Sequence, residues 1–474
     1  MHIDVGSVYV TASEPHKVKA RLSDTFDSRQ KGIRRLVIGE GIAEIEDNAF
    51  AGCENLLELE LPDSLEVIGN YAFRGCKSLT GIAFPKSVTE IGNGAFEECK
   101  ALTSIAIPES VTRISAYAFQ SCSNLASVGI PYGVQEIGSD SFRNCLGLTS
   151  IVIPESVMKI GANAFEDCIN LTSISFLGGV RAIGENAFKG CTSLASIAIP
   201  DSVTEIGKNA FGHCKSMTSC VIPKGVTVIN EKAFYGCTRL KSVVISEGIS
   251  EISPNAFQGC MELTSLVIPE SVTKIDYCAF KDCTSLSSVK IPSGVTKIGT
   301  AAFERCTGLK NVEISNGVMT IGMDAFDECT ALTSIAIPES VCEIGSSAFR
   351  RCSSLTNIVI PDNVTQIGSW AFKYCTALTS IIIPEGITSI KESTFQGCAK
   401  LKAIVLPESL KMIDIKAFKG CASLVSITIP RRVSMLGCSA FEKCESLCHI
   451  MLPNNTLRNR DVFKDCPKKN IIRY

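Results

Sequence analysis

A spacing of 23 residues runs through the sequence from about residue 31 to residue 444 without an insertion or a deletion. Phenylalanine stands at position 50 and at every 23rd position to 441, and cysteine stands at position 53 and onward to 444. These two columns define eighteen consecutive repeats. A fixed period of this length predicts a solenoid, in which each repeat buries its apolar side only against its neighbours.

The repeat also predicts the domain organisation. An ordinary core stops growing near about 250–300 residues, whereas a solenoid lengthens by stacking, so the 474 residues need no second core. We expect residues 1–30 to form an N-terminal lead-in or cap, with one strand within Val5–Val10 and a polar stretch over Ser13–Lys31. Residues 31–444 are the eighteen repeats, and residues 445–474 are a degenerate last repeat and C-terminal cap.

The hydrophobic pattern of residues 100–122 predicts the strands of one repeat. Ile105 and Ile107 alternate with small or polar residues, which is the period of a strand with one buried face. Pro108 ends this strand because it has no N–H to donate, and proline fills the same slot in fourteen of the eighteen repeats. A second inward-facing extended piece then ends at Ile114.

The rest of the repeat predicts a corner and a short helical turn. One position is glycine in eleven repeats and otherwise often Asn, Asp or Ser, which predicts a tight corner with a left-handed or irregular backbone. In the next segment Asn209 precedes Ala210, as a helix N-cap would. Ala210 and Phe211 lie four and three residues before Cys214, so a helical turn would place them on one side. The predicted fold is a mainly β repeat solenoid with short helical turns on the other side.

The cysteines predict a buried column of free thiols. The chain has 24 cysteines, of which eighteen share one repeat position and Cys466 continues the series. Identical positions of successive repeats stack, and cysteine packs there as a small hydrophobic residue. An inter-repeat disulfide ladder and metal clusters are the alternatives, although no Cys-x-x-Cys pair or Cys/His metal spacing occurs. We predict no cofactor and no metal site, and reduced thiols fit a reducing compartment best.

The repeat motif Leu-Thr-Ser-Ile-x-Ile-Pro-x-Ser-Val-Thr-x-Ile-Gly-x-x-Ala-Phe-x-x-Cys resembles the BspA-like class of leucine-rich repeats, found in Treponema- and Bacteroides-type surface proteins. The resemblance covers residues 31–466. It implies a curved solenoid with parallel strands on the concave face and a role in adhesion to host matrix proteins or other cells. It also implies a surface or secreted location, whereas the absence of a visible signal peptide favours the cytoplasm.

The outward positions of the strand form the candidate binding surface. If Ile105 and Ile107 point inward, the columns of Ser104 and Ala106 point outward, and the Ala106 column becomes aliphatic in two stretches. Exposed aliphatic stretches mark contact sites, although β-branched residues also simply suit a parallel sheet. We predict partner contact at Ser219, Val221, Ser242, Val244, Ser265, Val267, Asn357, Val359, Ser380, Ile382 and Val405.

Three further features have both a functional and a structural interpretation. The slot after the proline is acidic in eleven repeats, which suits a basic partner, weak binding of a divalent cation or a solvated turn. Trp370, Tyr71 and Tyr117 share the slot before the alanine, where an aromatic ring either anchors a partner or packs on the turn. Cys448 precedes His449, and a neighbouring histidine can favour the thiolate, so Cys448 is either a reactive thiol or an ordinary strand residue.

The sequence disfavours several functional classes. A net charge of −2 argues against a broad nucleic-acid surface, and no apolar run approaches the roughly 20 residues of a membrane span. No nucleophile elbow, phosphate loop, dinucleotide fingerprint or His-Glu-x-x-His motif occurs, and His2, His16, His213 and His449 are too far apart to converge.

We therefore predict a non-enzymatic module, favoured as a monomer, that binds a protein or glycan partner through the concave strand face in adhesion. An intracellular interaction scaffold is the alternative, and a Ser/Thr surface that templates ice or mineral is a third.

Overall fold

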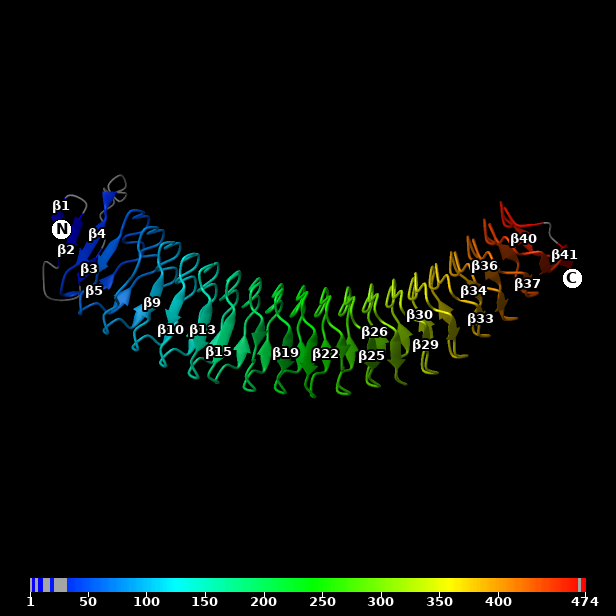
Figure 1. The fold of residues 1–474 in the computed structure, drawn as a ribbon, viewed down its shortest axis with the longest axis horizontal. Helices are drawn as coiled ribbons and strands as arrows, with labels where there is room; N and C mark the ends of the chain where they lie inside the picture. Colours follow the sequence, from blue (N-terminus) through cyan, green and yellow to red (C-terminus); the bar gives the residue numbers. More distant parts are fainter. Residues whose placement is uncertain (1, 5–6, 12–17, 21–31, 468–469) are drawn as a thin grey trace. The chain divides into compact units, whose positions relative to one another are not determined.

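The computed structural model describes residues 2–4, 7–11, 18–20, 32–467 and 470–474. They belong to two compact units, residues 1–240 and 241–474. Each unit is a parallel-strand β-solenoid, and the chain contains about 19 turns. Figure 1 shows the strands of each unit stacked in chain order. The solenoid predicted from the 23-residue period is therefore confirmed.

One turn of the solenoid has three sides, as residues 150–168 illustrate. The first side is the strand β13 (Ser150–Ile153), and the second is the two-residue strand β14 (Lys159–Ile160). The third is the segment Asn163–Cys168, which has no regular secondary structure. Strands stack only on their equivalents in the next repeat, so Ser150 pairs with Ser173. We name the three sides the long-strand sheet, the short-strand sheet and the turn side.

The long-strand sheet of unit 1 contains, besides β13, the strands β4 (Arg35–Ile38), β6 (Glu58–Glu60), β9 (Ser104–Ala106), β11 (Ser127–Gly129), β15 (Ser173–Phe176), β17 (Ser196–Ile197) and β19 (Ser219–Ile222). In unit 2 it contains β21 (Ser242–Ile245), β23 (Ser265–Leu266), β25 (Ser288–Ile291), β27 (Asn311–Ile314), β29 (Ser334–Ala336), β31 (Asn357–Val359), β33 (Ser380–Ile382), β35 (Ala403–Val405), β37 (Ser426–Thr428), β39 (His449–Leu452) and β41 (Asn470–Arg473).

The short-strand sheet of unit 1 contains, besides β14, the strands β5 (Ile42–Ile45), β7 (Val67–Ile68), β8 (Glu90–Ile91), β10 (Arg113–Ile114), β12 (Glu136–Ile137), β16 (Ala182–Ile183), β18 (Glu205–Ile206) and β20 (Val228–Ile229). In unit 2 it contains β22 (Glu251–Ile252), β24 (Lys274–Ile275), β26 (Lys297–Ile298), β28 (Thr320–Ile321), β30 (Glu343–Ile344), β32 (Gln366–Ile367), β34 (Ser389–Ile390), β36 (Met412–Ile413), β38 (Met435–Leu436) and β40 (Leu457–Arg458).

Additional strands extend the sheets at the chain ends. β1 (His2–Asp4) pairs antiparallel with β2 (Ser7–Val10), which pairs in parallel with β4, and β3 (Val18–Ala20) pairs with β5. β2 occupies most of the strand predicted within residues 5–10, whereas most of the predicted polar stretch 13–31 lies outside the described residues. At the other end β41 pairs with β39. Strands that cover the last repeat shield its apolar end, as a solenoid cap must.

The phenylalanine column forms the centre of each unit. Every ring from Phe50 to Phe441 is fully buried, and Phe463 is 8% exposed. Successive ring centroids lie 5.3–5.8 Å apart within Phe50–Phe234 and 5.1–5.6 Å apart within Phe257–Phe463, with nearly parallel planes. The predicted interior position of this column is confirmed.

The predicted helical turns are wrong, because the described residues contain no α-helix and the turn side is a stack of tight turns. The N–H groups of Asn163, Phe165 and Asp167 donate to carbonyls of the next repeat at 2.8 Å. Those of Ala164 and Cys168, in contrast, donate to the residue three positions earlier at 3.4 and 3.2 Å. Asn163 and Asp167 have left-handed backbones, with φ of 56° and 59°, and left-handed residues interrupt a helix. The residue before the alanine is therefore a left-handed residue and not an N-cap.

The corner glycines also have a different role from the one predicted. Gly161 and its equivalents have no positive φ. A Cβ on Gly161 would lie 2.6 Å from the backbone nitrogen of Ser139, and one on Gly368 would lie 2.3 Å from that of Ser346. Glycine is needed here because the backbones of successive repeats approach closely, which leaves no room for a side chain.

Candidate functional site

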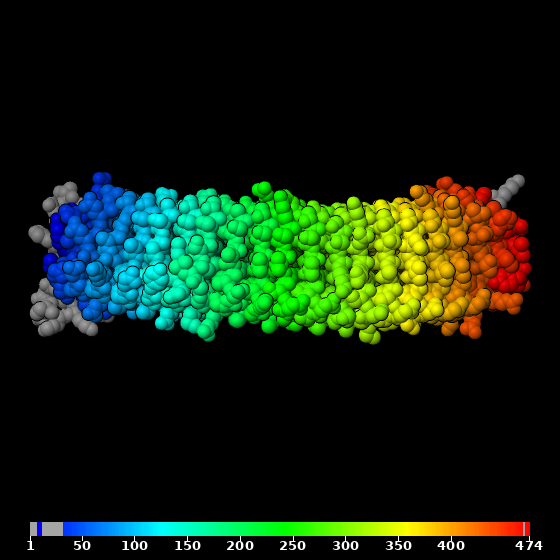
Figure 2. All heavy atoms as spheres, turned by 60° about the horizontal axis from the view of Figure 1, so that its bottom comes forward, coloured from blue at the N-terminus to red at the C-terminus, as the bar shows by residue number. Residues whose placement is uncertain are grey.

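The clearest candidate surface lies on the outer side of the long-strand sheet in unit 2, where β31, β33 and β35 follow one another. Val359, Ile382 and Val405 point away from the core and are 68%, 67% and 58% exposed. Ile382 pairs with Val405 in the strand register. Within each unit the surface colours of Figure 2 follow the sequence order, so adjacent repeats supply adjacent side chains. We name this surface, with Asn357 and Ser380, the aliphatic strand patch.

A shallow pocket lies within the aliphatic strand patch. The hydrogen-bonded sheet is interrupted here, because β31 ends a four-stranded sheet and β33 begins a two-stranded one. The pocket has a volume of about 280 Å³ and is lined by Val359, Ile382, Asn357, Ser380 and Asp362, among others. An apolar floor with polar groups at its edge is the usual composition of a contact site.

The other predicted contact residues are exposed as well, but they divide between the two units. Val221 is 53% exposed in unit 1, whereas Val244 and Val267 are 56% and 78% exposed in unit 2. Ser219, Ser242 and Ser265 are also exposed and lie two residues before these three valines. The alternation of serine and aliphatic residues thus predicted the outward positions correctly. Whether these residues contact a partner remains a prediction.

The acidic slot after the proline takes part in contacts between repeats. Glu270 accepts a hydrogen bond from the Lys290 ammonium at 2.7 Å and from the Ser293 N–H at 3.4 Å. These hydrogen bonds, first the one from Lys290, lower the pKa of Glu270. Glu385 likewise accepts from the N–H of Glu408, one repeat further on, at 3.3 Å. Such contacts support the interpretation of this slot as a structural turn.

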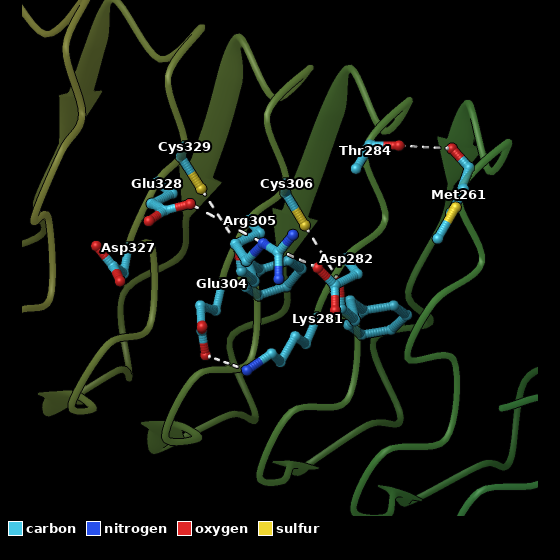
Figure 3. A network of polar contacts seen from close by, with 12 residues as sticks. Met261, Lys281, Asp282, Thr284, Glu304, Arg305, Cys306, Asp327, Glu328 and Cys329 are labelled. Atoms are coloured by element: carbon cyan, nitrogen blue, oxygen red, sulfur yellow. Dashed lines mark hydrogen bonds and ion pairs between the residues drawn. The ribbon is translucent and has the colours of Figure 1, made fainter. Parts of the chain in front are cut away.

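The turn side of unit 2 carries a network of alternating charges, shown in Figure 3. Arg305 lies between Asp282 and Glu328, at 3.2 and 3.9 Å. In the next column Lys281 contacts Glu304 at 2.8 Å. Opposite charges of adjacent repeats therefore neutralise one another, and each such pair on a surface contributes about 0–1 kcal/mol to stability.

Another pocket, of about 740 Å³, lies on the short-strand sheet beside β24 and β26. Only Ile275 and Ile298 pair between these two strands. The pocket wall includes Lys274, whose ammonium already contacts Asp276 at 2.9 Å and Glu251 at 3.1 Å. Because this charge is already neutralised within the protein, we do not place the functional site here.

The cysteine column is buried and reduced. No disulfide forms among the 24 cysteines, all of which lie within the described residues. The Cys168 thiol donates to the Phe142 carbonyl at 3.2 Å, and this contact recurs along both units. Burial raises the pKa of Cys168 to about 12, so the thiol is protonated at neutral pH. Cys448, singled out with His449, is partly exposed and lies immediately before β39, which begins at His449.

At pH 7.5 a thiol-labelling reagent should therefore modify at most four cysteines of the folded chain quickly. These are the ones that are not buried: Cys342, Cys438, Cys448 and Cys466. The thiolate is the reactive form, and the buried column lacks both access and ionisation. Mass spectrometry after brief labelling measures the number, and complete reaction in denaturant is the control. Rapid labelling of column cysteines in the folded chain would contradict the buried arrangement.

Two features of the described residues bear on other functions. Among the residues that the structure describes, no group of three or more His, Cys, Asp or Glu side chains is arranged to hold a metal ion. Within the described part of the chain there is also no helix long and apolar enough to span a membrane.

Sequence reasoning missed one set of residues on the turn side of unit 2. Met323, Asp324, Arg350 and Lys373 line a pocket beside Trp370, and only Trp370 was singled out from the sequence. The sequence did contain one signal for this pocket: Lys373 interrupts the alternation of positive and negative residues along its column of repeats.

Comparisons with known proteins extend these observations. A leucine-rich repeat protein from Bacteroides ovatus ATCC 8483 is 26% identical over 83% of this chain and 91% of its own, with a TM-score of 0.47. A leucine-rich cell surface protein from Faecalibacterium prausnitzii A2-165 is 30% identical over 65% of this chain and 87% of its own, with a TM-score of 0.42. The leucine-rich repeat protein of T. pallidum is 36% identical over 34% and 77%, with a TM-score of 0.33. No curated protein matches in sequence.

The model of the BspA type leucine-rich repeat region, which contains six copies of the repeat, matches residues 43–172, 158–287, 279–387 and 370–473. These four matches together cover most of the chain. The chain therefore belongs to the BspA-type leucine-rich repeat family.

Proposed function

We propose that the protein is a non-enzymatic binding module that contacts a protein partner through the aliphatic strand patch, in adhesion or another cell-surface interaction. The observation that carries this proposal is the row of three strongly exposed aliphatic side chains on consecutive repeats, Val359, Ile382 and Val405. Leucine-rich repeat proteins generally bind proteins, and this row offers a partner an apolar surface on strands of consecutive repeats.

The physical basis is the burial of apolar area at a surface that needs no reorganisation. Burying one Val or Ile side chain contributes about 1.5–3 kcal/mol relative to leaving it exposed. Asn357 and Ser380 border the row, and their polar groups provide hydrogen bonds at the rim. Backbone hydrogen bonds hold β33 and β35 in register, so a partner would lose little affinity to ordering the surface.

An interaction scaffold in a reducing compartment is the second candidate, because the cysteines are reduced and form no disulfide. It would use the same surface. Protease treatment of intact cells distinguishes the two candidates, since only a surface adhesin would release fragments of this chain.

Replacing Ile382 with Lys should weaken partner binding at least tenfold, because a charge placed at the centre of an apolar contact must be desolvated. Tenfold corresponds to about 1.4 kcal/mol. The measurement is saturable binding of matrix proteins and cell-lysate proteins to the immobilised full chain. Val152→Lys is the matched control, because Val152 occupies the same column on β13 in unit 1 and is 52% exposed.

The outcome that supports the proposal is a saturable partner whose affinity falls for Ile382→Lys and stays unchanged for Val152→Lys. An equal loss of affinity in both variants would show that binding depends on the general character of the surface. It would contradict a specific contact at the aliphatic strand patch. The absence of any saturable partner would contradict the proposed function itself.

A further inference from the structure

The turn side of unit 2 contains a pocket of about 380 Å³ that is separate from the aliphatic strand patch. Three successive repeats contribute to it. Its wall combines an indole, a thioether, hydroxyl groups and charged groups of both signs. Among the lining residues are Met323, Asp324, Ser347, Arg350, Trp370 and Lys373.

The indole of Trp370 stands at a position that disfavours it. The Trp370 backbone is left-handed, with a φ of 60°. Bulky side chains are rare in this conformation, whereas asparagine adopts it readily, and asparagine occupies the equivalent slot at Asn163 and Asn186. The indole is nevertheless 37% exposed at the pocket. A strained residue whose side chain faces a pocket indicates a role in binding more than in folding.

Lys373 interrupts the charge pairing of its column. Most equivalent cations contact a carboxylate of an adjacent repeat, as Lys281 does with Glu304 at 2.8 Å and Lys419 does with Glu442 at 2.9 Å. The neighbours of Lys373 in this column are Arg350 and Gln396. Within the described part of the chain no carboxylate lies within ion-pair distance of the Lys373 ammonium, which instead lies 5.2 Å from the Tyr374 ring centroid.

The surroundings of Lys373 favour an anion. Burial, followed by the charges of Arg350, Lys416 and Arg351, lowers the pKa of Lys373, and the Glu392 carboxylate only partly offsets this. Arg350 is held by the Asp327 carboxylate, with its Nε 2.9 Å from Oδ1. Arg350 is thus neutralised, and Lys373 is left as the cation at the pocket whose ammonium makes no ion-pair contact with a carboxylate of the described residues.

The opposite wall provides groups that recognise hydroxyls. The Asp324 carboxylate accepts hydrogen bonds, and burial together with Asp327 raises its pKa. The Ser347 side chain is 4% exposed and hydrogen-bonds the Asp324 carboxylate, which it orients. An aromatic face beside a carboxylate, a hydroxyl and an ammonium matches a sugar ring, which has one apolar face and polar edges.

We propose that this pocket binds an acidic saccharide, with a sugar ring packed against the Trp370 indole and its carboxylate at the Lys373 ammonium. Asp324, oriented by Ser347, would bind a ring hydroxyl. The ligand carboxylate takes the place that a glutamate or aspartate of an adjacent repeat occupies beside the other cations of this column. The site is independent of the protein-binding surface proposed above.

The chain has a single tryptophan, so its intrinsic fluorescence reports on this pocket without a label. Titration of the full chain with tetragalacturonate at about 0.15 M salt, where exposed charges are screened beyond about 8 Å, should give a saturable change in emission. Neutral galactotetraose should give none. Lys373→Gln should raise the Kd at least tenfold, and Lys400→Gln, an exposed lysine two repeats further on, should leave it within twofold.

Trp370→Asn tests the indole by calorimetry. Asparagine suits the left-handed backbone, so the unfolding midpoint should be equal to or above that of the native chain, while the binding heat should disappear. Equal binding of galactotetraose, equal weakening by Lys400→Gln, or no saturable signal with tetragalacturonate would each overturn the proposal.

Discussion

Between pH 7.5 and pH 9.5 the solenoid should lose most of its free energy of unfolding. Burial raises the pKa of the column thiols, to about 12 for Cys99, Cys168, Cys237 and Cys398. An exposed thiol of the unfolded chain ionises near pH 8.5. The unfolded state therefore releases protons in a range where the folded state keeps them.

The sign of the effect follows from these two values. The folded-state pKa lies above the unfolded-state pKa, so the contribution is fully present below about pH 8.5 and is lost as the pH rises toward about 12. Each thiol removes about 1.4 kcal/mol at pH 9.5. A cooperative block with five column cysteines would lose about 7 kcal/mol, against a typical total of about 5–15 kcal/mol.

Urea unfolding at pH 7.5, 8.5 and 9.5 in the presence of a reductant measures this loss by circular dichroism. A variant with Cys99, Cys168 and Cys398 replaced by alanine is the control for other titrating groups. Its loss of free energy between pH 7.5 and pH 9.5 should be smaller by about 1.4 kcal/mol for each thiol removed from the cooperative block. A free energy that is the same at pH 7.5 and pH 9.5, or an unaltered slope in the variant, would contradict the buried thiol column.

The sequence was sufficient to predict the solenoid and its interior. Because each repeat contacts only its neighbours, residues 23 positions apart must stack, and this places Phe165 and Cys168 inside without further information. Alternation of serine with aliphatic residues likewise identified the buried and exposed sides of β31 and β33. These predictions rest on periodicity, and in a repeat protein the same pattern occurs many times.

The details that the sequence did not predict depend on contacts between backbones. The spacing of Ala210 and Cys214 suits a helical turn, but a left-handed residue at Asn209 redirects alternate N–H groups to the next repeat. Asparagine favours both the helix N-cap and the left-handed conformation, so the residue type alone could not distinguish them. The close approach at Gly161 similarly involves the backbone of another repeat.

The candidate sites were predictable to different extents. Outward residues such as Ile382 follow from the strand period. The pocket at Trp370, in contrast, forms from three repeats, and its signal is a departure from the pattern of the chain itself. Lys373 matters because the cations at equivalent positions have acidic partners, which becomes visible only when side chains of adjacent repeats are placed together.

Replacing Phe349 with Ala should destabilise unit 2 by about 3–5 kcal/mol, the usual effect of removing a fully buried ring. Phe349 is fully buried, and its ring stacks between Phe326 and Phe372 with centroids 5.6 Å away on each side. The substitution removes both stacking contacts and leaves a cavity between two repeats, so it weakens the coupling along the column as well as one repeat.

The weakened coupling should separate the unfolding of the repeats near Phe349 from that of the rest of the chain. Trp370 reports on the next repeat, so its fluorescence should change at a lower urea concentration than the circular dichroism signal of the whole chain. Ser334→Ala, an exposed position on β29 in the same repeat, should stay within about 0.5 kcal/mol of the native chain. Coincident transitions in Phe349→Ala, with a midpoint close to the native one, would mean that ring stacking does not couple the stability of neighbouring repeats. The interior would then have to depend mainly on the backbone ladders between repeats.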